Sequence, residues 1–214
     1  MSGKANSGAE TPCGFEITYP SGNVAQIRIV SSPLGVLRDS LKISLLEAVE
    51  LLIDNRQIRA LIITGSGRSF SVGSDIEEFR QDADWLLRSV DIEHSLFDTL
   101  EACRLPIIAA CNGLTLGGGA ELALACDLRV ASRSAQFGFP EVTLGTFAGG
   151  GGTQRLPRHV GEGVAKHLLM TGRLISATEA LRIGLVQELC ADDELQEHTL
   201  AIAEGFARLS PEAV

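Results

Sequence analysis

The feature that most constrains this chain is a run of three glycines, Gly117 to Gly119, between two apolar segments. The preceding segment, Pro106–Ala110, has the pattern of a buried strand, and the following one, Ala120–Cys126, that of a helix. Because glycine lacks a Cβ, another molecule can lie directly on the backbone at this turn. The first N–H groups of a helix have no acceptor within it and carry partial positive charge. The junction is therefore suited to stabilising negative charge on an oxygen atom.

Glu121 is the one charged residue among the apolar neighbours of this second segment. We therefore expect its carboxylate to point into the protein, near the glycine turn. On this stretch alone, the alternative is a tight turn followed by a half-buried helix with a glutamate on its surface.

Length alone allows one or two domains. The chain has 214 residues, of which 45% are hydrophobic, enough for one core. No repeat or low-complexity linker divides it, so we expect a disordered lead-in over residues 1–12 and a single domain over 13–214. No apolar run approaches the ~20 residues of a membrane span, and the N-terminus does not resemble a signal peptide. The net charge of −9 argues against a nucleic-acid partner but allows an anionic small ligand.

The five cysteines are scattered and show no metal-type pairing, as expected of reduced thiols in a cytoplasmic protein. Strands and helices alternate, which indicates an α/β fold. We expect strands at Phe15–Tyr19, Val24–Val30, Ala60–Thr64, Pro106–Ala110 and Leu128–Ala131. We expect helices at Asp39–Asn55, from Ile76 with interruptions to Glu101, and at Ala120–Cys126, Glu162–Met170, Thr178–Ile183 and Asp193–Arg208. Asp75 is the expected N-cap of the second helix, and Ser176 with Glu179 forms a capping box.

Several glycine-loop chemistries are disfavoured. Gly65-Ser-Gly67 follows a strand, but Phe70 occupies the position of the third glycine in a dinucleotide-binding motif. No glycine cluster is followed by the lysine of a phosphate-binding loop. Ser71 and Ser74 lack the surroundings of a hydrolase nucleophile. The histidines lie in segments expected to be solvated, and none has metal-ligand spacing, so we expect no metal: His94, His159, His167 and His198. Backbone amides and carboxylates remain as the candidate chemical groups.

Four stretches together resemble the crotonase (enoyl-CoA hydratase/isomerase) superfamily. They are Ser69–Ile76, Pro106–Gly113 with Leu116–Ala123, Gln136–Glu141, and Leu144–Pro157. The resemblance covers the chain from about Phe15 onward. It implies a spiral of repeated ββα units with flanking C-terminal helices, assembled as homotrimers or dimers of trimers. It also implies an acyl-CoA thioester as substrate, with no cofactor other than the CoA that the substrate carries.

The resemblance also implies a set of site residues. The backbone amides of Val72 and Gly118 would form an oxyanion hole for the thioester carbonyl, and Glu121 and Glu141 would be the catalytic carboxylates. Gly73, Ser74, Asp75 and Gly117 would contribute to substrate binding. For Glu141, the alternative is an ordinary turn residue after Pro140.

Hydration of a 2-enoyl thioester suits these groups, because enolate-like charge develops on the thioester oxygen, where two N–H donors stabilise it. We expect Glu121 to hold and deprotonate the water and Glu141 to donate the proton to the α-carbon. The alternatives are a double-bond isomerase or an acyl-CoA hydrolase on the same scaffold, or a catalytically weak interaction subunit.

The chain departs from the family pattern in three places. Ser31–Arg38 lacks the Asn-Ala-Leu-like pattern that contacts the CoA adenine, and Ala148 stands where proline is common. The family continues past the position of Val214 into further helices, so we expect the C-terminal helical part to be incomplete.

Overall fold

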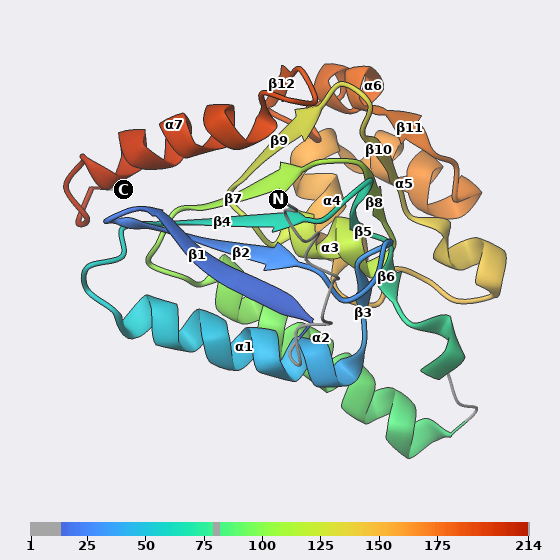
Figure 1. Ribbon diagram of the computed structural model, residues 1–214. Helices are drawn as coiled ribbons and strands as arrows, with labels where there is room; N and C mark the ends of the chain where they lie inside the picture. Colours follow the sequence, from blue (N-terminus) through green and yellow to red (C-terminus); the bar gives the residue numbers. More distant parts are fainter. Residues whose placement is uncertain (1–13, 79–81, 214) are drawn as a thin grey trace, which may run out of the picture.

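The computed structural model describes residues 14–78 and 82–213. The expected disordered lead-in therefore lies outside the described residues. Six strands form the main sheet in the order β1-β2-β4-β7-β9-β12 (Figure 1). Their bounds are β1 Phe15–Ser21, β2 Val24–Ile29, β4 Ala60–Gly65, β7 Ile107–Cys111, β9 Leu128–Ser132 and β12 Glu188–Cys190. β1 runs antiparallel to β2, and the other neighbouring pairs are parallel.

Two smaller sheets adjoin the main one. The first has the order β11-β10-β8-β5, and the second pairs β3 with β6. Their strands are short: β3 Val36–Leu37, β5 Ser69–Ser71, β6 Gly73–Ser74, β8 Leu114–Leu116, β10 Gln136–Gly138 and β11 Ile175–Ser176. None of these was expected from the sequence, because two or three residues show no alternating pattern.

Helices cover both faces of the main sheet, which explains why its central strands are apolar throughout. α1 (Asp39–Asp54) and α2 (Ala83–Glu101) lie on one side and α7 (Leu195–Ala207) on the other (Figure 1). Leu195 and Ala203 of α7 join a separate apolar cluster with Ile62 and Ile108. The remaining helices are α3 Gly118–Leu124, α4 Gly152–Val160, α5 Glu162–Thr171 and α6 Ala177–Arg182, with 3₁₀ turns η1 Ile76–Glu78 and η2 Pro140–Leu144. The α/β class is confirmed.

The stretch expected to be helical with interruptions from Ile76 to Glu101 contains two helical elements among its described residues. η1 covers Ile76–Glu78, and α2 begins at Ala83 with Asp82 as its N-cap. Asp75 lies just before η1, and its Oδ1 accepts a hydrogen bond from the Glu77 amide at 3.0 Å, as expected of an N-cap.

The Ser176 hydroxyl accepts from the Glu179 amide at 3.2 Å, as a capping box requires. The Glu179 carboxylate forms a salt bridge with Arg173. Within residues 14–78 and 82–213, no helix has both the length and the apolar character needed to cross a membrane.

Candidate functional site

A cavity of about 200 Å³ lies where β6, the start of α3 and η2 meet the first half of α2. One face of α2 forms a wall, with Trp85, Leu86, Ser89, Val90 and Glu93 at helical spacing. Of the residues expected at the site, seven line this cavity: Val72, Ser74, Asp75, Gly117, Gly118, Glu121 and Glu141. The eighth, Gly73, packs behind it against Gly118. The structure thus brings together residues that lie far apart in the sequence.

The glycines allow two backbone segments to touch at the floor of the cavity. A Cβ at Gly119 would lie 2.2 Å from the carbonyl oxygen of Ser71, and one at Gly73 would lie 2.6 Å from the amide nitrogen of Gly118. Gly117 has φ +53°, a conformation that side chains disfavour. The close packing therefore requires glycine and fixes the start of α3 against β5 and β6.

The structure corrects one of the two expected oxyanion donors. The Val72 amide donates to the carbonyl oxygen of Leu34 at 3.1 Å, so it is engaged in holding the loop rather than directed at a ligand. The Ser74 nitrogen lies next to Gly118, 3.5 Å from the position of a Cβ on Gly118, and Ser74 also lines the cavity. Gly118 is the first residue of α3, where an N–H group has no acceptor within the helix. Ser74 and Gly118 thus form the candidate donor pair.

Glu121 is buried, with 2% of its surface exposed, as the apolar sequence around it indicated. Its Oε1 accepts a hydrogen bond from the Gly152 amide at 2.7 Å, at the start of α4. Burial raises the pKa of Glu121 to about 8, with a further contribution from Glu93, while the Gly152 hydrogen bond opposes the rise. Glu121 can therefore carry a proton at neutral pH.

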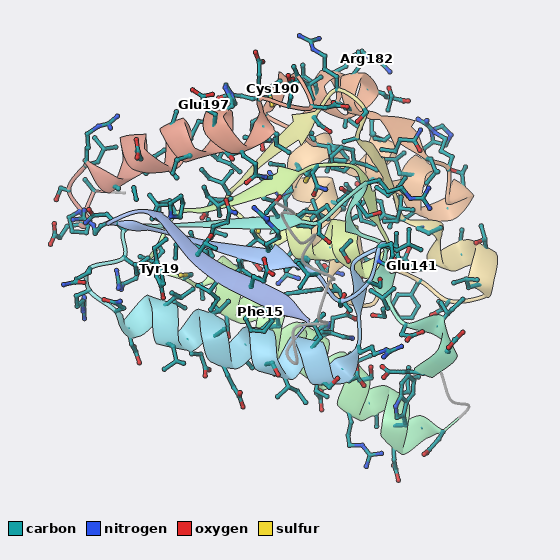
Figure 2. The ribbon with its side chains drawn as sticks, in the orientation of Figure 1. Phe15, Tyr19, Glu141, Arg182, Cys190 and Glu197 are labelled. Atoms are coloured by element: carbon teal, nitrogen blue, oxygen red, sulfur yellow. The ribbon has the colours of Figure 1, made fainter. Side chains whose placement is uncertain are left out.

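Glu141 is a pocket residue and not a surface turn residue. Both of its carboxyl oxygens are buried and have no hydrogen-bond partner among the described residues. Burial raises its pKa, and the charge of Glu93 adds to this. Its Oε1 would lie 3.4 Å from a Cβ on Gly117, next to the glycine turn. Figure 2 labels Glu141 on the side of the molecule where β3 and β6 lie in Figure 1. A buried carboxyl without a partner is suited to binding a water or a substrate group.

Arg155 fixes the glycine loop that supplies the Gly152 amide. Its guanidinium donates to the carbonyl of Gly150 at 2.9 Å and to Asp98 and Glu101 of α2 at 2.6 Å and 2.9 Å. His94 of α2 contacts the same loop, with its Nε2 2.7 Å from the Gly149 carbonyl oxygen.

The expectation that all four histidines are solvated is wrong for three of them. His94, His159 and His198 are partly buried, and burial lowers the pKa of His159 to about 4. Within the described ranges, no cluster of three or more His, Cys, Asp or Glu side chains is arranged to hold a metal ion.

Sequence reasoning missed Glu93, a further carboxylate that lines the cavity, and its partner Lys42. The Lys42 side chain is 1% exposed, and its Nζ lies 3.7 Å from Glu93 and 3.0 Å from Asp39. One signal was available: Lys42 occupies a position on the buried face of α1, beside Leu41 and Leu45. A lysine there indicates a buried acidic partner.

Comparisons with known proteins agree with this geometry. Residues 20–214 match the family described as enoyl-CoA hydratase/isomerase. The crotonyl-CoA hydratase of Syntrophomonas wolfei is 44% identical over 172 residues, which are 79% of this chain and 66% of that protein. The short-chain-enoyl-CoA hydratase of Clostridium acetobutylicum is 45% identical over 163 residues, 75% of this chain and 62% of that protein.

The chain thus spans about two thirds, or slightly less, of the length of these relatives. Among solved structures, the enoyl-CoA hydratase of Bacillus anthracis superposes with a TM-score of 0.89 at 36% identity, covering 92% of this chain and 78% of that one. The family match, the shared fold and the paired glutamates lead to one conclusion: the chain belongs to the enoyl-CoA hydratase/isomerase family.

Proposed function

We propose that the protein is an enoyl-CoA hydratase that adds water across the 2,3 double bond of a 2-enoyl-CoA thioester. The observation that carries the proposal is the pair of buried carboxyls, Glu121 and Glu141, facing one cavity beside the glycine turn. The names of its relatives, crotonyl-CoA hydratase and short-chain-enoyl-CoA hydratase, support the same reaction class. No cofactor is needed for this chemistry beyond the CoA of the substrate.

In this proposal the thioester oxygen accepts hydrogen bonds from the amides of Ser74 and Gly118. Negative charge builds on this oxygen when water attacks the β-carbon, so the donors bind the transition state more tightly than the substrate. Rigid glycine packing holds the two amides in place before the substrate arrives. Removing one such donor in other enzymes costs about 10²–10³ in turnover.

Catalysis requires that one of the two glutamates is ionised and the other is protonated. The ionised carboxylate takes a proton from the attacking water, and the protonated one gives a proton to the α-carbon. We assign the first role to Glu121, because a carboxylate with a pKa of about 8 is a stronger base than an ordinary one. In the free protein the proton resides mainly on Glu121, so it must pass to Glu141 through the shared water before turnover.

Glutamate-to-glutamine variants test this assignment. Gln keeps the shape of Glu but neither accepts nor donates the proton, so Glu121→Gln and Glu141→Gln should each lower crotonyl-CoA hydration by at least ~10²-fold. The double variant should be little worse than the poorer single one, because both groups act on one water. An isomerase working through Glu141 alone would keep bond migration in Glu121→Gln. Wild-type hydration by Glu121→Gln would rule out the two-carboxylate mechanism.

We further propose a homotrimer or a dimer of trimers. Large apolar side chains on the α5–β11 side, Met170 and Leu174, are 74% and 48% exposed, which suits a surface covered by another copy. Light scattering at several concentrations tests this. A monomer with full hydratase activity would show that assembly is not needed.

A further inference from the structure

Glu93 stands at the innermost turn of the α2 wall and contacts the same backbone as the two glutamates described above. A Cβ on Gly118 would lie 2.9 Å from Glu93 Oε1. A Cβ on Gly150 would lie 3.0 Å from Glu93 Cδ and 2.9 Å from Glu121 Oε2. The carboxyls of Glu93 and Glu121 therefore both lie beside Gly150, within mutual electrostatic reach.

Glu93 is held in this position by a network that reaches into α1 and β6. The Ser74 hydroxyl donates to Glu93 Oε1 at 3.2 Å, and Lys42 Nζ donates to the same hydroxyl at 3.2 Å. Lys42 also pairs with Asp39, whose Oδ1 accepts from the Ser89 hydroxyl at 2.9 Å. Because Lys42 is fully enclosed and lies beside Glu93, it stabilises a negative charge there.

We propose that Glu93 is a positioning residue that holds the shared proton in the site, mainly on Glu121, through the repulsion between carboxylates. The proposal rests on the hydratase function above in one respect only, namely that turnover needs the single proton that Glu121 and Glu141 share. Glu93 itself takes no proton from the water and gives none to the substrate.

The groups around Glu121 differ in which of its protonation states they favour. Glu93 from α2 and Glu141 from η2 favour its protonated form, whereas Arg155 and the Gly152 amide from α4 favour its ionised form. Of the charged neighbours, Glu93 contributes most to the raised pKa of Glu121. Lys42 Nζ, 3.7 Å from Glu93 Oε1, offsets part of the cost of placing this carboxylate beside Glu121.

The test is a titration that needs no substrate. With ¹³C-labelled glutamate carboxyls, NMR follows the Glu121 resonance, assigned by its loss in Glu121→Gln, while pH is varied. In Glu93→Gln we expect the Glu121 midpoint to fall by on the order of one pH unit. Asp91→Asn is the matched control, because it removes one charge from an exposed position of the same helix and should leave the midpoint unchanged.

Two further measurements keep the proposal refutable. The first is the pH–rate profile of crotonyl-CoA hydration, whose upper apparent pKa should fall in Glu93→Gln by the same amount as the NMR midpoint. The second is thermal stability: if Glu93 were merely structural, its replacement would lower the melting temperature and leave both the upper apparent pKa and the NMR midpoint unchanged. If Glu93→Gln does not fold, Lys42→Met with Glu93→Gln removes both buried charges together. An unchanged Glu121 midpoint in a folded variant overturns the proposal. A shifted midpoint in a protein that hydrates no enoyl-CoA would instead refute the proposed function alone.

Discussion

Replacing Glu121 by glutamine should stabilise the protein at neutral pH while removing its activity. The pKa of Glu121 is 4.5 in the unfolded reference and about 8 in the folded protein. Between these values the folded state binds the extra proton, so stability falls as pH rises. Each pH unit between the two pKa values lowers the unfolding free energy of the wild type by about 1.4 kcal/mol. From the unfolded pKa to pH 7, roughly 2.5 units, this loss amounts to about 3 kcal/mol, and the glutamine variant does not suffer it because its side chain does not ionise.

Urea unfolding of wild type and Glu121→Gln, measured at equal protein concentration from pH 4 to 9, tests this. The difference in unfolding free energy should be near zero below the unfolded pKa, increase with pH, and level off above about pH 8. Glu50→Gln, at an exposed position of α1, is the control and should stay within about 0.5 kcal/mol at every pH. A Glu121→Gln difference that does not vary with pH would refute the linkage argument.

Three further outcomes follow from the same contacts. Gly119→Ala should lower the unfolding free energy by at least ~2 kcal/mol, because the methyl group would meet the backbone of β5, whereas Gly163→Ala, which faces open space, should not; urea unfolding decides. Arg155→Met should lower both melting temperature and turnover by freeing the glycine loop of α4, and Arg158→Met, which loses only an exposed salt bridge, should do neither. The pH–rate profile should be bell-shaped, and its two apparent pKa values should be assigned to the glutamate pair as a unit. A flat profile from pH 5 to 9 would contradict acid–base catalysis by the two glutamates.

The sequence predicts the elements with strong periodicity and misses those set by tertiary packing. The helix expected at Asp39–Asn55 is found at Asp39–Asp54, because its apolar stripe faces the sheet. α4 was not expected, since its sequence begins with glycine and contains Pro157. It is helical because Leu156 and Arg155 are buried against neighbouring elements, and packing outweighs propensity.

The candidate site was likewise predicted only in part from the sequence. Glu121 was expected to point inward because its neighbours in this run are apolar, and its burial excludes the alternative of a glutamate on the helix surface. The Val72 amide was expected to be free for a ligand but donates to the Leu34 carbonyl, a contact between distant residues that the sequence does not reveal. Glu93 was missed because the groups that give it a role, Lys42 and Ser74, come from other parts of the chain.

Incubation of the protein with crotonyl-CoA in H₂¹⁸O tests the central claim most directly. Mass spectrometry locates the label in the products while loss of the enoyl absorbance reports turnover. Hydration predicts an intact thioester that carries ¹⁸O in a new hydroxyl group on the β-carbon, formed at least ~10²-fold more slowly by Glu121→Gln. Migration of the double bond without label would indicate an isomerase. Label found only in the carboxylate of a released free acid would indicate a hydrolase, and either result would contradict the proposed function.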